Sequence, residues 1–271
     1  MLNLMFSGNY KVFDGLIIAS ISILKYCKDP MTVYVLTMDM TEVNKDYKPI
    51  SQSNINRLEK LYKETNEASK VILVDVKDIY LKELGLSPNA DSFFTPYALL
   101  RLLADKIDVI PDKVLYLDTD IVANGNIREL YDIDISNYEI AGARDYYGKV
   151  FFNPRYINSG VMLMNMNKIR ETNMLGKALK MCNRRKVFLP DQTAINKHTK
   201  RKLILPRRFN EQKRLSKKTL IRHFSATLKF FPKFKKQNIK PWHVDDVHNI
   251  LKIYSFDDIF EKHRKIINED K

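Results

Sequence analysis

The chain is poor in cysteine, and two thiols, Cys27 and Cys182, among 271 residues are too few for a disulfide framework. We therefore expect a reducing, cytoplasmic compartment and two buried, inert thiols. No apolar run approaches the roughly 20 residues that cross a bilayer. Residues 1–6 lack the basic start and long apolar stretch of a signal peptide and predict a first strand instead.

Glycine and proline are also scarce, at 8 and 10 residues, which excludes a fibrous or low-complexity chain. No internal period indicates a repeat protein. The hydrophobic fraction of 45% is sufficient for one sizeable core. We expect residues 1–271 to form a single domain.

Acidic residues are in short supply, with 32 Asp and Glu against 46 Lys and Arg and a formal net charge of +14. Residues 197–240 hold sixteen Lys or Arg and one acid, Glu211. Such an excess attracts polyanions: nucleic acid, anionic lipid or a phosphate-bearing substrate. No domain boundary is predicted here, because residues 203–205 and 221–224 have the pattern of core strands. We expect the basic C-terminal region, from about residue 197 to residue 271, to contact an acceptor or a membrane.

Strand and helix patterns alternate along the first half of the chain. Short apolar runs predict strands at residues 2–6, 32–36, 71–76 and 113–117. Apolar residues at helical spacing predict helices within residues 13–24, from Ser51 or Ser53, and within residues 96–107. In the second half we expect strands at 139–143 and 160–166 and helices at 168–183 and 191–198. The alternation predicts an α/β fold with a Rossmann-like, mostly parallel sheet and helices on both faces.

Asp118 and Asp120 flank Thr119 directly after the strand predicted at residues 113–117. Ligands of open α/β sheets bind at the carboxyl ends of strands. If the backbone leaves the sheet there, both carboxylates reach one Mn²⁺ or Mg²⁺ ion, which prefers oxygen ligands and also holds a diphosphate. Such a triplet is common in ordinary turns, so it is weak evidence alone. Its position directly after a buried strand is what favours the metal hypothesis.

Residues 115–122, Leu-Tyr-Leu-Asp-Thr-Asp-Ile-Val, closely resemble the Asp-x-Asp strand of glycosyltransferase family 8, which includes glycogenin and bacterial lipopolysaccharide galactosyl- and glucosyltransferases. The resemblance extends over most of the chain. Residues 158–165, Asn-Ser-Gly-Val-Met-Leu-Met-Asn, are similar to the family's Asn-x-Gly-Val-x-Leu-x-Asn segment. Asp191-Gln192 is similar to its Asp-Gln pair, and His223 begins a segment that resembles its His-x-x-Gly-x-x-Lys.

The resemblance implies a GT-A nucleotide-diphospho-sugar transferase fold and a role for each matching residue. It implies a metal site made by Asp118, Asp120 and His223. It implies donor contacts from Asn9, Tyr10, Arg101, Asp118, Thr119, Asp120, Asn158, Ser159 and Lys229. It implies that Asp191 hydrogen-bonds sugar hydroxyls and that Gln192 lies near the anomeric carbon.

The chain also departs from the family pattern. Gly8 stands where many members have a residue that contacts the base, and Ala226 replaces the usual glycine after His223. Lys229 is not followed by Pro-Trp, which comes after Lys240 instead. Either lysine is a candidate for the diphosphate contact, and the spacing from His223 favours Lys229.

Several of these residues have an ordinary structural interpretation too. Tyr10 could be a core aromatic, Arg101 a charge on a helix surface, and His223 a hydrogen-bonded core histidine. Asn158 could cap a turn. Their occurrence together, in the family's order, favours the functional interpretation.

The resemblance implies retaining transfer of a hexose, glucose or galactose, from a UDP-sugar to a glycan, glycolipid or protein acceptor. The amide oxygen of Gln192 is a poor nucleophile, which favours front-face attack over a covalent intermediate. A glycosidase is less favoured, because Asp118 and Asp120 are better placed to share a cation than to flank a bond.

The alternative of a different class is a non-catalytic polyanion-binding protein that uses the basic and aromatic residues 197–242. No recognised nucleic-acid motif accompanies this stretch, so no nucleic-acid partner is expected. Basic residues beside aromatics also suit peripheral contact with the anionic inner face of a membrane.

Overall fold

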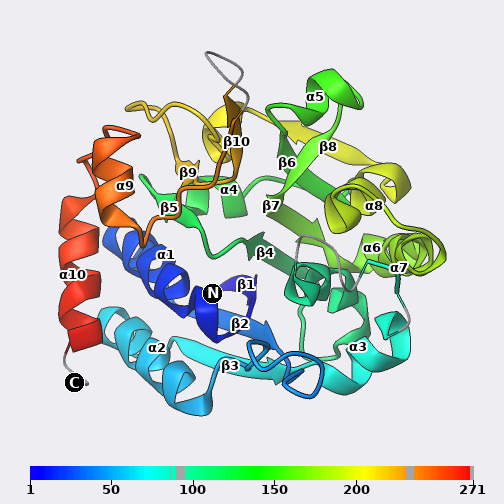
Figure 1. Ribbon diagram of the computed structural model, residues 1–271, viewed down its shortest axis with the longest axis horizontal. Coiled ribbons are helices and arrows are strands. Elements are labelled where there is room, and N and C mark those ends of the chain that lie inside the picture. Colours follow the sequence, from blue (N-terminus) through cyan, green and yellow to red (C-terminus); the bar gives the residue numbers. More distant parts are fainter. Residues whose placement is uncertain (86, 90–94, 230–234, 269–271) are drawn as a thin grey trace.

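The computed structural model describes residues 1–85, 87–89, 95–229 and 235–268. Its centre is a seven-stranded sheet with strand order β3-β2-β1-β4-β7-β6-β8 (Figure 1). The strands are β1 (Leu2–Ser7), β2 (Met31–Thr37), β3 (Lys70–Asp75), β4 (Lys113–Leu117), β6 (Ile140–Arg144), β7 (Ile157–Asn165) and β8 (Lys202–Leu205).

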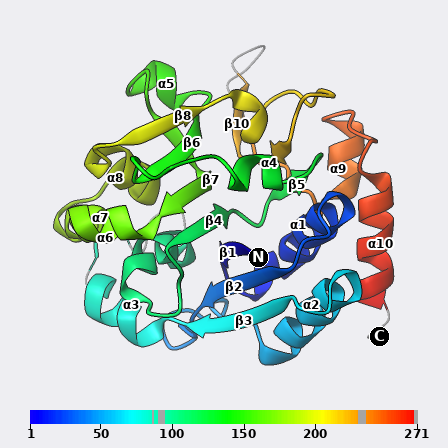
Figure 2. The same cartoon turned by 180° about the vertical axis from the view of Figure 1, so that it is seen from behind.

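Helices cover both faces of this sheet, as Figures 1 and 2 show from opposite sides. One face packs against α1 (Phe13–Tyr26), α2 (Gln52–Thr65) and α10 (Asp257–Asn268). The other packs against α3 (Lys77–Leu84), the 3₁₀ helix η2 (Pro96–Lys106), α6 (Met166–Thr172), α7 (Met174–Arg184) and α8 (Pro190–His198). The predicted α/β class, with a mostly parallel sheet covered on both sides, is confirmed.

Alternate residues of each strand belong to two different cores. Leu115 and Leu117 of β4 pack on the α1 side, whereas Val114 and Tyr116 pack on the η2 side. Successive side chains of a strand point to opposite faces, and each buried aliphatic side chain stabilises the fold by about 1.5–3 kcal/mol. The two cores therefore hold β4 firmly on both faces, directly before Asp118.

The one antiparallel strand of the central sheet, β7, pairs with β4 on one side and with β6 on the other. The carboxyl end of β4 therefore meets the start of β7, and the Asp118 amide donates to the Gly160 carbonyl at 2.7 Å. This reversal brings residues 158–160 to the edge where Asp118 emerges.

Two small antiparallel pairs complete the sheet structure. β5 (Ile121–Ala123) pairs with β9 (Ile221–His223), with Ile121 opposite His223. β10 (Thr227–Lys229) pairs with β11 (Lys235–Gln237). The first pairing joins two segments about a hundred residues apart and sets His223 beside Asp120.

The remaining helices are short. They are η1 (Tyr10–Val12), α4 (Arg128–Tyr131), α5 (Gly148–Phe151), η3 (Arg207–Phe209) and α9 (Val244–Asn249). Phe224, Val247 and Phe256 belong to the same core as α1, so the C-terminal region packs on the first helix. In the described part of the chain, no helix has the length and apolar character needed to cross a membrane.

The predicted strands and helices have counterparts in the structure, with one correction. The helix predicted at residues 168–183 is two helices, because Asn173 adopts a left-handed backbone (φ 51°) between α6 and α7. Asparagine tolerates that conformation better than most residues, so the pattern of apolar residues continues across the break. Both cysteines are free and buried, as predicted.

Candidate metal and donor site

Asp118, Asp120 and His223 form a compact cluster at the carboxyl end of β4, with candidate ligand atoms all within 4.8 Å of one another. His223 Nε2 lies 3.1 Å from Asp120 Oδ1 and 3.7 Å from Asp118 Oδ2. Atoms that bind one Mg²⁺ or Mn²⁺ ion at about 2.1 Å lie roughly 3–4 Å from each other, and two carboxylates with an imidazole suit such an ion. The residues present therefore fit a divalent metal.

Asp120 is buried, yet it is surrounded by positive charge. Lys240 Nζ lies 2.5 Å from Asp120 Oδ2, and His223 contacts the other oxygen. Burial alone would raise the pKa of the Asp120 carboxyl, but Lys240 and then His223 hold that pKa well below its usual value. Asp120 therefore stays ionised, as a metal ligand must be.

Asp118 is oriented by two donors on one of its oxygens. Its Oδ1 accepts from Arg101 Nη2 at 2.8 Å and from the Tyr116 hydroxyl at 2.9 Å. Oδ2 is thereby left facing His223. Burial raises the pKa of Tyr116, so its hydroxyl remains a donor. The Arg101 guanidinium lies 4.4 Å from the centre of the Tyr116 ring, and this arginine is buried and not a helix-surface charge.

A chain of amides fixes the orientation of His223. Asp145 Oδ2 accepts from Asn158 Nδ2 at 2.9 Å, so Asn158 Oδ1 faces the Gly160 amide and Asn210 Nδ2. Asn210 Oδ1 then faces His223 Nδ1 at 3.0 Å. A carboxylate only accepts, so each amide in turn has one allowed orientation, and Nδ1 must carry the proton. Nε2, the other ring nitrogen, therefore points toward the two carboxylates and is the atom through which His223 would bind a metal.

Gly160 closes the cluster from the β7 side. A Cβ on this residue would lie 2.3 Å from His223 Cε1 and 2.5 Å from Asp118 Oδ2. Any side chain at this position would therefore displace His223 or Asp118, which explains on steric grounds why residue 160 is a glycine.

Lys240 is anchored by the residues around it. Trp242 packs against Gly15 of α1, where a Cβ would lie 2.4 Å from the indole and 2.6 Å from the Thr119 carbonyl. The Lys-Pro-Trp segment is thus held against the same turn that carries Asp118 and Asp120. Lys229 ends β10, and its side chain lies outside what the structure describes. The preference for Lys229 over Lys240 stays a prediction.

Asp191 and Gln192 are presented by the first turn of α8. Leu189 precedes this helix with φ 52°, an unusual backbone for a bulky residue and one found often at functional sites. Asp191 Oδ2 accepts from Ser159 Oγ at 3.0 Å and lies 3.3 Å from Arg101 Nε. The structure therefore joins Asp191 to the Arg101–Asp118 pair.

Gln192 has its amide held at both ends. Its Oε1 accepts from the Ser159 amide at 3.0 Å, and its Nε2 donates to Asp145 Oδ2 at 3.3 Å. Both Asp191 and Gln192 are nearly buried. The pair is fixed by these hydrogen bonds and is adjacent to the Asp118–Asp120–His223 cluster, which we call the metal cluster.

Asn9 and Tyr10 are two further donor contacts predicted from the sequence. Asn9 and Tyr10 follow β1, and Asn9 Nδ2 donates to the Asp46 carbonyl at 3.3 Å. Tyr10 is 39% exposed, with Lys11 and Lys48 about equally close to its ring. Its alternative interpretation as a core aromatic is therefore wrong. No hydrogen bond or ion pair between described residues joins either one to Asp118.

Two residues of the site were not predicted from the sequence. Asp145 follows β6, and a carboxylate at the carboxyl end of a strand is a signal that would have identified it. Asn210 follows η3 in a loop without periodicity, and no sequence signal indicates that it contacts His223.

The model of Glycosyl transferase family 8 matches residues 2–246. A Haemophilus influenzae protein that is named as a glycosyltransferase is 26% identical over 193 residues, which are 68% of this chain and 54% of that protein. The chain thus spans about half the length of this relative.

Two solved structures share the fold. Galactosyltransferase LgtC, in complex with donor and acceptor sugar analogs, has a TM-score of 0.67 and 16% identity, with 97% of this chain and 96% of that chain covered. Glycosyltransferase GlyE of Streptococcus pneumoniae TIGR4 has a TM-score of 0.59 and 21% identity, with 78% and 47% covered. The predicted GT-A fold is confirmed.

Proposed function

Because the chain belongs to glycosyltransferase family 8, we propose that this glycosyltransferase moves a hexose, glucose or galactose, from a UDP-sugar to a hydroxyl of a glycan, glycolipid or protein. We further propose that the configuration of the sugar is retained and that Mn²⁺ or Mg²⁺ is required. The observation that carries the proposal is the Asp118–Asp120–His223 cluster, joined through Arg101 to Asp191 at one edge of the sheet.

The divalent ion would be held by Asp118, Asp120 and His223. When bound, it would neutralise the negative charge that develops on the leaving diphosphate. Lys240 is the lysine that the described residues bring to this cluster, and it would then be available to contact the same phosphates. Lys229 is the alternative on sequence spacing.

In the proposed reaction, the bond between the anomeric carbon and the diphosphate oxygen breaks. The acceptor oxygen forms its bond to that carbon on the same face, and its proton passes to an oxygen of the departing diphosphate. Gln192 donates through Nε2 to the Asp145 carboxylate and accepts through Oε1 from the Ser159 amide, and an amide oxygen is a weak nucleophile. This supports front-face attack without a covalent intermediate.

Asp191 and Gln192 would act on the sugar. In the proposed transition state the sugar carries positive charge, which a fixed carboxylate and a fixed amide dipole stabilise. Ser159 would hold both groups, since it donates to Asp191 through its hydroxyl and to Gln192 through its amide. Arg101 and Asn158 would serve the donor indirectly, by orienting Asp118 and His223. Asn9 and Tyr10 remain the proposed contacts of the base and ribose, and Thr119 remains a proposed donor contact.

We also propose that residues 1–271 act as one catalytic unit that contacts an anionic membrane peripherally. Val150 and Phe151 of α5, and Phe188, are 65–73% exposed, and they neighbour Lys149 and Lys186 in the sequence. Apolar anchors beside cations suit an anionic interface, where a lipid-linked acceptor would be located. Residues 230–234 of the basic stretch lie outside the described residues, so support comes from α5 instead.

The alternative of a polyanion-binding protein loses support, because several cations and an aromatic of the basic stretch are paired or buried inside the protein. Arg207 pairs with Glu211, Arg208 with Glu129, and Lys240 with Asp120. Arg222 is buried, and burial lowers its pKa to about 10. Phe224 is also buried and is not accessible for stacking on a base.

A panel of sugar nucleotides tests the proposed function. A correct donor that binds only the folded state raises its stability, and the shift should require Mn²⁺ or Mg²⁺. The same donor should be hydrolysed slowly without an acceptor. Absence of both effects for every UDP-hexose, together with a salt-sensitive gel shift on nucleic acid, would favour the polyanion-binding alternative instead.

A further inference from the structure

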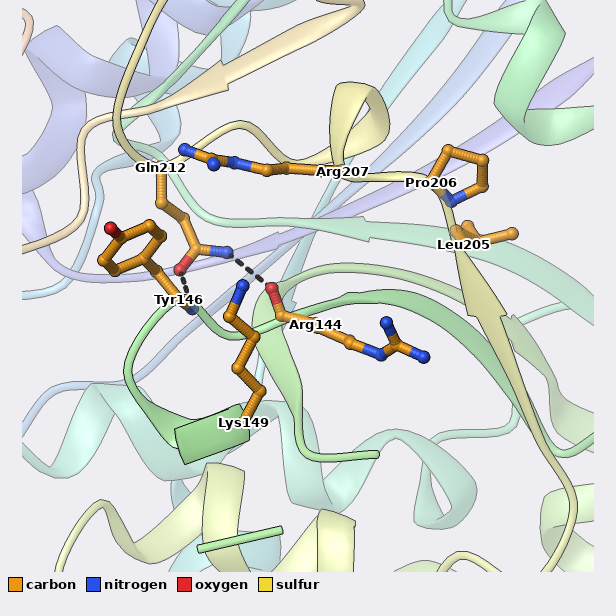
Figure 3. A pocket seen from close by; sticks show the side chains of 7 residues that line it. All are labelled: Arg144, Tyr146, Lys149, Leu205, Pro206, Arg207 and Gln212. Atoms are coloured by element: carbon orange, nitrogen blue, oxygen red, sulfur yellow. Dashed lines mark hydrogen bonds between the residues drawn. The ribbon is translucent and has the colours of Figure 1, made fainter. Parts of the chain in front are cut away.

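A cavity lies at the carboxyl ends of β6 and β8, and its lining shares no residue with the cluster of Asp118, Asp120 and His223. It has a volume of about 160 Å³ and is lined by Arg144, Tyr146, Lys149, Leu205, Pro206, Arg207 and Gln212 (Figure 3). In this view the Lys149 side chain points toward Gln212 and the Arg144 carbonyl. We name this cavity the cationic pocket.

Positive charge is gathered around one aromatic ring of the pocket. The side-chain cations of Lys213, Arg207 and Lys149 lie 4.2, 5.1 and 5.3 Å from the centre of the Tyr146 ring. Of the lining cations, Arg207 has an acidic partner, Glu211. Among the residues that the structure describes, no acidic side chain pairs with Arg144, Lys149 or Lys213. Such an excess of like charge in one cavity is balanced most simply by a bound anion.

Hydrogen bonds connect the pocket to Gln192, which is proposed to act on the sugar of the donor. Gln212 Oε1 accepts from the Tyr146 amide at 2.9 Å, and Gln212 Nε2 donates to the Arg144 carbonyl at 3.2 Å. Between Arg144 and Tyr146 lies Asp145, which accepts from Gln192. The pocket is therefore next to the Gln192 side of the site, whereas the proposed diphosphate contact, Lys240, is at Asp120.

We propose that the cationic pocket binds a phosphate or carboxylate group of the acceptor, so that the enzyme glycosylates an anionic glycan. The assignment of this anion to the acceptor rests on the proposed function. A donor diphosphate bound through a divalent ion at Asp118 and Asp120 would have Lys240 beside it as a further cation. Arg144 and Lys149 are then left for a second anion. Tyr146 also carries a hydroxyl donor, whereas the Gln212 amide is held by its own hydrogen bonds and forms part of the wall.

Binding of matched sugars tests the pocket without catalysis. The probes are methyl glucoside, methyl glucoside 6-phosphate and methyl glucuronide, titrated calorimetrically into the full chain with EDTA present. At least one anionic probe should bind about tenfold or more tightly than the neutral one, because hydrogen bonds to charged groups are stronger. The two anionic probes distinguish phosphate from carboxylate.

Two double variants locate the effect. Arg144→Gln/Lys149→Gln should abolish the preference for the anionic probe. Lys217→Gln/Lys218→Gln, which removes the same charge from a separate surface cavity, should keep it. A wild-type chain without the preference, a preference that survives in the first variant, or an equal loss in both variants would overturn the proposal.

Assays of sugar transfer then show whether a failure lies in the proposed pocket or in the proposed glycosyltransferase function. The readout is the ratio of kcat/KM for the anionic and neutral acceptors within each variant, so a general loss of activity cancels. The ratio should fall about tenfold in Arg144→Gln/Lys149→Gln only. If no donor is turned over, the proposed function fails, while the binding preference still decides whether the pocket holds an anion.

Discussion

The metal cluster and the cationic pocket differ in how their charge is compensated. In the cluster, every charged group has a fixed partner: Asp118 with Arg101, and Asp120 with Lys240 and His223. In the pocket, Arg144 and Lys149 have no acidic partner among the described residues, and charges of one sign surround Tyr146. The cluster is organised before any ligand binds, whereas the pocket lacks its counter-charge.

This difference matches the two tasks of the proposed reaction. A preorganised cluster costs little reorganisation when charge develops on the diphosphate, which every donor has in common. An uncompensated pocket gains most from a partner of the opposite sign and so selects among acceptors. Changes at the cluster should therefore abolish chemistry, and changes at the pocket should alter preference.

The largest effect is expected from Asp120→Asn. Loss of this carboxylate should lower Mn²⁺-dependent donor hydrolysis by about 1,000-fold or more, because several kcal/mol of charge stabilisation are removed. Asp118→Asn should behave alike. The surface variant Asp132→Asn should remain near wild type in steady-state assays. Full activity of both cluster variants would refute the metal assignment.

Gly160→Ala tests whether the cluster is as tightly packed as its contacts indicate. The new methyl group overlaps His223 and Asp118, so Mn²⁺ affinity should fall by at least about tenfold and stability by about 1–3 kcal/mol. Gly142→Ala is the matched control on β6, where the nearest atom is the movable end of Ile157 at 3.0 Å. Equal metal affinities in the two variants, measured by paramagnetic titration, would contradict the steric argument.

Gln192→Ala should reduce turnover more than it weakens donor binding. The proposed contact strengthens only as positive charge develops, so kcat should fall by about 100-fold while KM changes by less than about threefold. Steady-state kinetics with the donor varied give both values. A raised KM with unchanged kcat would show that Gln192 only binds the ground state.

Asn210 should matter through His223 and not through the substrate. Asn210→Leu removes the acceptor at Nδ1 and should weaken Mn²⁺ binding by about 10-fold. Asn210→Asp keeps an acceptor for Nδ1 but loses the donor to Asn158, so it should recover part of that affinity. Identical losses in the two variants would indicate a packing role instead of control of the His223 tautomer.

The smallest effect is expected at the pocket. Lys149→Gln relieves repulsion between like charges, so the free energy of unfolding should stay within about 0.5 kcal/mol of wild type or increase. Lys11→Gln, which breaks the ion pair with Asp46, should not increase it. Thermal unfolding compares the two, and a clear loss of stability in Lys149→Gln alone would indicate that the pocket is already compensated.

The same contrast explains what the sequence could predict. The apolar runs predict β4 and its neighbours because burial on both faces leaves a strong pattern. The position of Asp118 and Asp120 follows from that strand. The cationic pocket was visible only as net charge, because tertiary packing brings Arg144 and Lys149 together with Arg207 from a distant part of the sequence.

Other parts of the site could not be predicted because they depend on chain reversals. The antiparallel entry of β7 brings Gly160 to Asp118, and a run of apolar residues does not encode strand direction. Between His223 and Lys240 the chain forms the β10–β11 pair, so a spacing from His223 could not indicate that Lys240 pairs with Asp120.

The central claim is that Asp118, Asp120 and His223 bind one divalent ion that holds the donor diphosphate. The most direct test is anomalous diffraction at the manganese edge from crystals grown with Mn²⁺ and UDP. We predict one strong peak about 2.0–2.3 Å from an oxygen of each aspartate and from His223 Nε2, with the diphosphate on the same ion. A peak at other residues, or UDP bound with no ion at this cluster, would contradict the account.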